Sequence, residues 1–174
     1  TWWLRTAHTL RPILQRPEAV ALDLCCGTGD MTLALDKHRP KPAPNNSIVI
    51  LSENEAGIEG SAVVSSAADP APILALDFSH TMLTLGAQKF AGRNILPIET
   101  DALHLPLASS SVDLITSAFG FRNLASYPDA LTEFHRVLRP GGEIAILECN
   151  QPGGLIGALY SLYFKRILPK LGGL

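Results

Sequence analysis

The stretch Ala-Val-Ala-Leu-Asp-Leu-Cys-Cys-Gly-Thr-Gly-Asp, residues 19–30, decides the fold that this sequence predicts. Its first seven residues are mostly apolar, which is typical of a strand buried on both faces of a parallel sheet. Gly27 and Gly29 then form a tight turn, and residues 30–38 are expected to form a helix that ends before Pro40. Such a turn lets a ligand approach the backbone closely, and the helix start offers unpaired N–H groups.

The alternation of strand and helix continues along the chain. We expect strands at 73–76, 95–99, 112–117 and 143–148, and helices that start after Ser79 and Ser126. This order implies a parallel α/β sheet with right-handed crossovers. Residues 40–72 interrupt the alternation, are bracketed by prolines and could form a hairpin. Because so long a connection is uncommon in a compact domain, they are predicted to be a surface insertion in a single domain, 1–174.

The composition excludes several classes of protein. The 174 residues are 47% hydrophobic and 17% charged, which argues against a disordered chain. The 14 basic and 16 acidic side chains give no electrostatic footprint for nucleic acid. Three cysteines without a CxxC spacing predict neither a disulfide framework nor a metal site, so a reducing cytoplasm is the simplest compartment. No apolar run reaches the about 20 residues that span a bilayer.

Acidic residues stand at the ends of three predicted strands, namely Asp23, Asp77 and Asp101. A carboxylate after the second strand can bind both hydroxyls of a ribose. The dinucleotide motif G-x-G-x-x-G needs a third glycine, and that position holds Thr32. Three acids with no basic residue nearby suit a cationic adenosine ligand such as S-adenosylmethionine better than a phosphate. Taken singly, each aspartate is equally consistent with a helix cap or turn residue.

Six segments carry a more specific signal: DLCCGTGD (23–30), LDFSHTML (76–83), DALHLPL (101–107), FGFRNL (119–124), RVLRPGG (136–142) and LECNQP (147–152). Together with the tail, they resemble signatures of the ubiquinone/menaquinone-biosynthesis C-methyltransferases. The resemblance implies a Rossmann-like class I methyltransferase fold with a mostly parallel sheet. It also implies S-adenosylmethionine as the cofactor, and as substrate a polyprenylated quinol such as demethylmenaquinol.

The resemblance further implies roles for single residues. Thr28 would contact the methionine part of the cofactor, Asp77 would hold the ribose, and Asp101 and Ala102 would flank the adenine. Several family members carry a cofactor-contacting serine just before Phe-Gly; here that position is alanine, with Ser117 next to it. The expected cofactor-binding residues are Asp23, Gly27, Thr28, Gly29, Asp77, Phe78, Asp101, Ala102 and Ser117.

Arg122, in the family-specific segment, is the candidate catalytic residue. A guanidinium stays charged, so it would stabilise a phenolate or polarise a water rather than act as a base. A structural ion pair is an equally good interpretation. His104 is a weaker candidate base, and His135 is expected on a helix surface.

The termini raise further expectations. Family members begin before Thr1 and continue past Leu174, so the chain is expected to be a fragment that lacks the C-terminal edge strands of the sheet. The tail helix, expected at 155–168, carries Tyr160 and Tyr163, which would line the substrate pocket or pack in the core. With the Trp2-Trp3 pair, this helix is also a candidate for peripheral contact with a membrane. A homodimer is left open.

Three alternative functions remain. The first is a methyltransferase acting on another small molecule, since a fold and a cofactor site do not fix the substrate. The second is a truncated, non-catalytic module that binds the cofactor. The third, a nicotinamide-dependent oxidoreductase, is disfavoured by the missing third glycine. The sequence does not separate menaquinone from ubiquinone precursors.

Overall fold

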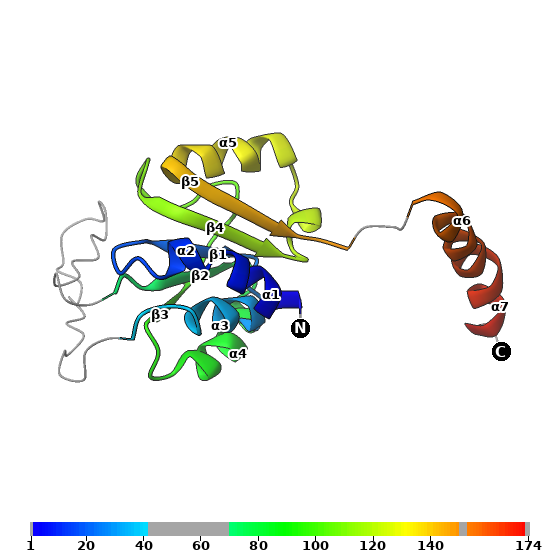
Figure 1. The fold of residues 1–174 in the computed structure, drawn as a ribbon, viewed down its shortest axis with the longest axis horizontal. Helices are drawn as coiled ribbons and strands as arrows, with labels where there is room; N and C mark the ends of the chain where they lie inside the picture. The colour runs from blue at the N-terminus through cyan, green and yellow to red at the C-terminus, as the bar shows by residue number, and fades with distance from the viewer. Residues whose placement is uncertain (1, 42–69, 150–152, 173–174) are drawn as a thin grey trace.

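The chain folds around one all-parallel sheet with the strand order β3-β2-β1-β4-β5. A computed structural model describes residues 2–41, 70–149 and 153–172 (Figure 1). The strands are β1 (Ala21–Leu24), β2 (Ile73–Asp77), β3 (Ile95–Glu99), β4 (Val112–Ala118) and β5 (Leu138–Leu147). The helices of the main body are α1 (Trp2–Thr9), α2 (Arg11–Leu14), α3 (Asp30–Asp36), α4 (His80–Phe90) and α5 (Tyr127–Val137). The predicted parallel α/β fold is therefore confirmed.

The sheet separates two hydrophobic cores. One lies between the sheet and helices α1 to α4, and the other between the sheet and α5. All four residues of β1 are buried, because the strand contributes Ala21 to the first core and Leu22 and Leu24 to the second. The mostly apolar run that opened the sequence argument is thus a central strand covered on both faces.

Both predicted helix caps are present. The hydroxyl of Ser79 accepts a hydrogen bond from the Met82 N–H at 3.4 Å at the start of α4. The hydroxyl of Ser126 accepts one from the Asp129 N–H, also at 3.4 Å, at the start of α5. These caps satisfy N–H groups that the first helical turn leaves without a partner.

The start of the fifth strand differs from the prediction. The sequence predicts this strand at 143–148, but β5 already begins at Leu138 and includes Pro140-Gly-Gly142. The pairing with β4 passes from Val112–Leu138 directly to Leu114–Glu143. Residues 139–142 therefore form an irregularity within the strand, which Gly141 accommodates with a φ of +82°.

The two N-terminal helices were not predicted, and they correct one expectation. Trp3 is partly buried, and its ring meets that of Phe119 edge to face, with centroids 5.0 Å apart. Trp2 next to it is 66% exposed. The expectation that both tryptophans face a membrane is wrong for Trp3, which packs against the end of β4.

The predicted tail helix is present as a continuous helical segment. It consists of α6 (Gly154–Leu162), a π-helical turn η2 (Tyr163–Ile167) and α7 (Leu168–Gly172), and it extends away from the sheet in Figure 1. Within the three described ranges, no helix is long and apolar enough to cross a membrane. The hairpin expected within 40–72 falls on residues 42–69, outside the described part of the chain.

Candidate functional site at the carboxyl ends of the strands

A cavity of about 620 Å³ opens where the parallel strands end. From β1 the strand order continues to β2 and β3 on one side and to β4 and β5 on the other. Ligands of open α/β sheets usually bind at the strand ends beside such a switch point, and the cavity lies there. Its walls are mostly apolar or backbone, and its charged lining residues are Asp77 and Asp101. The expected site residues that line it are Gly27, Asp77, Phe78, Asp101 and Ala102.

The turn after β1 presents one of its two glycines to the cavity. Gly27, at φ +54°, lines the cavity and donates its N–H to Asp77 Oδ2 at 2.8 Å. Gly29, at φ +84°, serves packing instead, because a Cβ there would lie 2.3 Å from the Phe90 ring. The hydroxyl of Thr28 accepts a hydrogen bond from Lys89 of α4 at 3.1 Å. Gly29 and Thr28 are therefore engaged with α4 rather than with the cavity wall.

Asp77 joins the turns that follow β1 and β2. Its second oxygen, Oδ1, accepts the Ser79 N–H at 2.8 Å. Beside it, Phe78 and Met82 are 78% and 44% exposed although both are large and apolar. An exposed aromatic ring next to a carboxylate offers a flat apolar surface and a hydrogen-bond acceptor to one ligand.

Asp101 and Ala102 lie in the loop of residues 100–111 between β3 and β4. Asp101 Oδ1 accepts the Leu103 N–H at 2.9 Å, and Oδ2 lies 3.7 Å from His104 Nδ1. The Asp101 side chain is about half exposed, whereas Ala102 is buried in the α5 core. The loop thus turns a carboxylate toward the cavity while its next residue anchors it to the core.

Asp23 lies beneath the cavity and does not line it. The carboxyl is fully buried and accepts hydrogen bonds from the hydroxyls of Thr32, at 2.6 Å, and Thr116, at 2.7 Å. Burial raises the pKa of Asp23 to about 6, although both hydroxyl bonds act in the opposite direction. Thr32, which occupies the third-glycine position, therefore connects α3 to β1 through this carboxyl.

Two cavity residues that the sequence argument missed have strained backbones. Cys25 and Phe119 directly follow β1 and β4 and have φ of +54° and +59°, a region that residues other than glycine rarely adopt. Burial and the nearby carboxylates of Asp77 and Asp23 raise the pKa of the Cys25 thiol to about 11, so the thiol is neutral at pH 7 and is a poor nucleophile.

Gly120 and Ser117 complete this side of the site. A Cβ on Gly120 would lie 2.2 Å from Cys25 Cβ, which explains the glycine of the Phe-Gly motif. The Ser117 hydroxyl is buried and has no hydrogen-bond partner among the described residues. Ala118, next to it, lines the cavity.

The contact between Gly120 and Cys25 gives a prediction for stability. Gly120→Ala is expected to lower the free energy of unfolding by about 2 kcal/mol, since a tightly packed site cannot absorb an added methyl group. Cys25→Gly in the same chain should restore most of the loss, because it removes the clashing Cβ and the unfavourable φ. Urea unfolding of the single and double variants measures both effects. Additive losses would contradict this explanation.

Arg122 does not itself line the cavity, although Gly120 and Asn123 close to it in the chain do. It belongs to the short 3-10 helix η1 (Phe121–Asn123), pairs with Glu148 at 3.4 Å, and stands over the Phe119 ring with its Cζ 5.9 Å from the centroid. His104, the weaker candidate base, is exposed on the loop. His135 is exposed on α5, as predicted.

None of the described tail residues lines this cavity. Tyr160 stacks on Phe164, with centroids 4.3 Å apart, and Tyr163 meets the same ring edge to face. Neither tyrosine lines the cavity. In the described ranges, no group of three His, Cys, Asp or Glu side chains is arranged to hold a metal ion.

Comparison with known proteins places these features in context. The sequence model of the ubiE/COQ5 methyltransferase family matches residues 2–174. A demethylmenaquinone methyltransferase of Staphylococcus epidermidis is 36% identical over 167 residues, which cover 95% of this chain and 58% of that protein. The demethylmenaquinone methyltransferase of Thermus thermophilus is 37% identical over 175 residues, 99% of this chain and 66% of that protein. The chain thus spans about three fifths of these curated relatives.

A solved structure supports the fold independently. The crystal structure of a SAM-dependent methyltransferase from Aquifex aeolicus superposes with a TM-score of 0.60 at 19% identity, covering 97% of this chain and 78% of that one. At this identity the likeness concerns the fold alone. The predicted Rossmann-like architecture of class I methyltransferases is confirmed.

Proposed function

This chain belongs to the ubiE/COQ5 methyltransferase family, and from this premise we propose that the protein uses S-adenosylmethionine to methylate a ring carbon of a polyprenylated quinol. The names of its relatives favour a demethylmenaquinol-type substrate. The observation that carries the proposal is the cavity at the strand ends, where the charged lining residues are two carboxylates, Asp77 and Asp101. Such a lining suits an adenosyl ligand with a positive sulfonium and disfavours a pyrophosphate.

The residues present fit this cofactor. Each oxygen of Asp77 has two lone pairs, so the carboxylate can accept ribose hydroxyls while it keeps its bonds from Gly27 and Ser79. Phe78 supplies an apolar face for the adenine, and Asp101 supplies an acceptor for its exocyclic amino group. The unpaired hydroxyl of Ser117, next to cavity-lining Ala118, is a further candidate contact. Asp23, Thr28 and Gly29 would act indirectly, by holding the turn.

The cofactor supplies an electrophilic methyl group, and the chain must orient the acceptor carbon and stabilise the quinol as a phenolate. We assign the second role to Arg122, whose guanidinium stands over the ring of cavity-lining Phe119 and pairs with Glu148. A fixed cation near a developing oxyanion lowers the barrier without having to move during the reaction. Correct positioning of the two reactants can contribute roughly 7–11 kcal/mol.

The substrate class also favours contact with a membrane surface. A cavity of about 620 Å³ cannot enclose a long polyprenyl chain together with a cofactor. The tail segment exposes Leu159, Leu162 and Phe164 and carries Lys165 and Arg166, a combination that suits an anionic lipid surface. Co-sedimentation with anionic vesicles, and its loss on Lys165→Glu plus Arg166→Glu, tests this. Light scattering of the same samples tests for a homodimer.

Isothermal titration of the chain with S-adenosylmethionine, and with NAD as the control, tests the cofactor. Selective binding of S-adenosylmethionine is expected, and selective binding of NAD would overturn the assignment. A methyl-transfer assay then compares a demethylmenaquinol with an unrelated catechol. Transfer to the catechol alone would indicate a different small-molecule substrate, and binding without transfer to either would indicate a cofactor-binding module.

A further inference from the structure

We propose that Glu133 and Arg136, on α5, are positioning residues that hold the loop carrying Asp101 and Ala102 in place against the cofactor. Neither residue lines the cavity. The inference rests on the proposed function, because it concerns the part of the cavity assigned to the adenine. It adds two residues that do not touch the ligand themselves and that act by binding the backbone of the loop of residues 100–111.

The loop of residues 100–111 contains little structure of its own. It joins β3 to β4 without a helix, although it crosses from one strand of a parallel sheet to another. Its internal backbone bonds include one from the His104 N–H to the Asp101 carbonyl, at 3.1 Å, and one from Leu107 to Leu105, at 2.7 Å. Side chains of the loop itself, namely Thr100, Asp101 and Ser111, bind some of the remaining polar groups. Several others are bound by α5.

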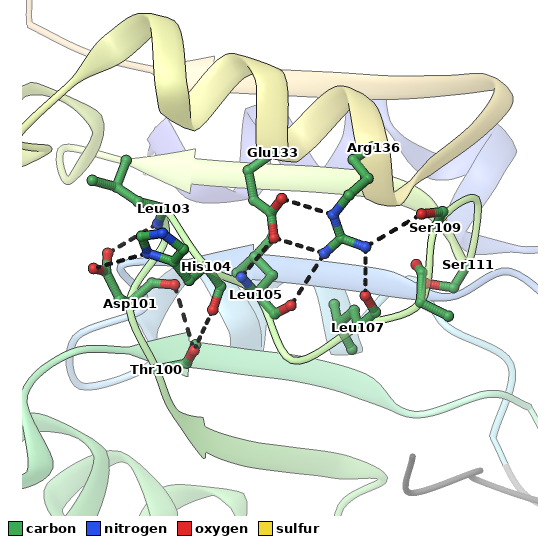
Figure 2. A network of polar contacts seen from close by, with 11 residues as sticks. Thr100, Asp101, Leu103, His104, Leu105, Leu107, Ser109, Ser111, Glu133 and Arg136 are labelled. Atoms are coloured by element: carbon green, nitrogen blue, oxygen red, sulfur yellow. Dashed lines mark hydrogen bonds and ion pairs between the residues drawn. The ribbon is translucent and has the colours of Figure 1, made fainter. Parts of the chain in front are cut away.

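Figure 2 shows how α5 holds the middle of this loop. Glu133 Oε1 accepts the Leu105 N–H at 2.7 Å, and Arg136 Nη2 donates to the Leu105 carbonyl at 3.2 Å. Arg136 Nη1 donates to the Leu107 carbonyl at 2.8 Å and to the Ser109 hydroxyl at 3.4 Å. Both backbone polar groups of Leu105 are therefore bound by this one pair of side chains.

The two side chains also fix each other. Arg136 donates from Nε to Glu133 Oε2 at 2.7 Å and from Nη2 to Oε1 at 2.6 Å, a bidentate arrangement. These bonds hold the pKa of Glu133 below its usual value, so the pair stays charged at neutral pH. Isolated surface ion pairs usually contribute little, but this pair is rigid and its remaining donors and acceptors are used by the loop.

The connection from the pair to the cavity is short. Leu105 is buried in the α5 core, as is Ala102, and a tight turn closed by Asp101 lies between them. A shift of Leu105 is therefore transmitted to the Asp101 carboxylate, which faces the adenine end of the cavity. The expected consequence of loosening the pair is weaker recognition of the adenine base, with little effect on the ribose end at Asp77.

The test measures base selectivity. Titrating the full chain with S-adenosylhomocysteine and with S-inosylhomocysteine, in which a carbonyl replaces the exocyclic amino group, gives a ratio of two affinities. Arg136→Lys keeps the charge but loses the bidentate geometry, and it is expected to weaken S-adenosylhomocysteine binding about tenfold and to bring the ratio close to one. Asp101→Ala calibrates complete loss of selectivity. Glu133→Gln, a milder change, should reduce the ratio about threefold.

The matched control is Arg93→Lys. Arg93 pairs with Asp36 at 2.6 Å, and the exposed fractions of 44% and 19% resemble the 36% and 15% of the Arg136 and Glu133 side chains. This control should keep the wild-type ratio. An unchanged ratio in Arg136→Lys would overturn the inference while wild-type binding upholds the proposed function. Wild-type protein that binds neither ligand would overturn both. Equal loss in Arg136→Lys and Arg93→Lys would show a general effect on stability and reject a positioning role.

Discussion

Asp77→Ala is expected to weaken the binding of S-adenosylmethionine about a hundredfold. The carboxylate has two tasks, since it would accept the ribose hydroxyls and it already holds the backbone N–H groups of Gly27 and Ser79. Each hydrogen bond to a charged group is worth about 1.5–3 kcal/mol, so losing two such bonds to the ligand accounts for a change of at least a hundredfold. Isothermal titration measures it directly.

The control for this experiment is Glu99→Ala. Glu99 is the register partner of Asp77 on β3, and its exposed side chain contacts His80 rather than the cavity. It therefore matches Asp77 in charge and lies at the same level of the neighbouring strand. Binding should stay within about twofold of the wild type. A similar loss in both variants would show that the overall negative charge, rather than the Asp77 geometry, attracts the ligand.

Asp23→Asn is expected to remove a pH-dependent loss of about 3 kcal/mol in the free energy of unfolding. Burial raises the pKa of this carboxyl from 3.8 to about 6, and 1.36 kcal/mol corresponds to each tenfold change in proton affinity. Between about pH 4 and pH 6, the unfolded chain has released this proton while the folded chain keeps it. The folded state then binds more protons, so wild-type stability falls as the pH rises through this window and levels off above it.

The asparagine variant lacks this titration but can keep both hydroxyl partners. Thr32 donates to one oxygen of Asp23 and Thr116 to the other, and either hydroxyl can rotate to accept from an amide instead. Urea unfolding at a series of pH values, with the wild-type curve subtracted, cancels all other titrating groups. The free energy of unfolding of the variant, relative to that of the wild type, should rise from pH 4 to pH 7. A difference that does not vary with pH would contradict the expectation.

The strand pattern and the caps were predictable because they depend on local signals. A short apolar run between turn residues specifies a buried strand, and Ser79 and Ser126 stand where a helix needs an acceptor. Helix α1 was missed, since its eight residues gain their stability from packing on α3 and from the contact of Trp3 with Phe119. Both contacts join separate elements, and the one between Trp3 and Phe119 joins positions more than a hundred residues apart, which no local pattern reveals.

The sequence predicts which residues lie at the strand ends. It does not predict whether the side chain of such a residue faces the cavity or is hydrogen-bonded inside the protein. Asp77 ends β2, Asp101 lies just after the adjacent strand β3, and both line the same cavity, as expected. Asp23 also belongs to a strand end, but its side chain is buried, where it accepts hydrogen bonds from Thr32 of α3 and Thr116 of β4. The close approach of Cys25 to the Phe-Gly turn has one trace in the sequence, Gly120, but a glycine alone does not reveal which residue it makes room for.

The central position of β1 has a consequence for synthesis on the ribosome. The strand comes early in the chain, yet its partner Thr116 lies 93 residues after Asp23. At a translation rate of roughly 5–20 residues per second, the emerging strand waits roughly 5–20 seconds for its second neighbour. Throughout this time the edge of β1 that later pairs with β4 is open to other chains, although β2 can already pair with the other edge. Nascent chains of this protein are therefore expected to depend on chaperones until residue 118 has left the exit tunnel.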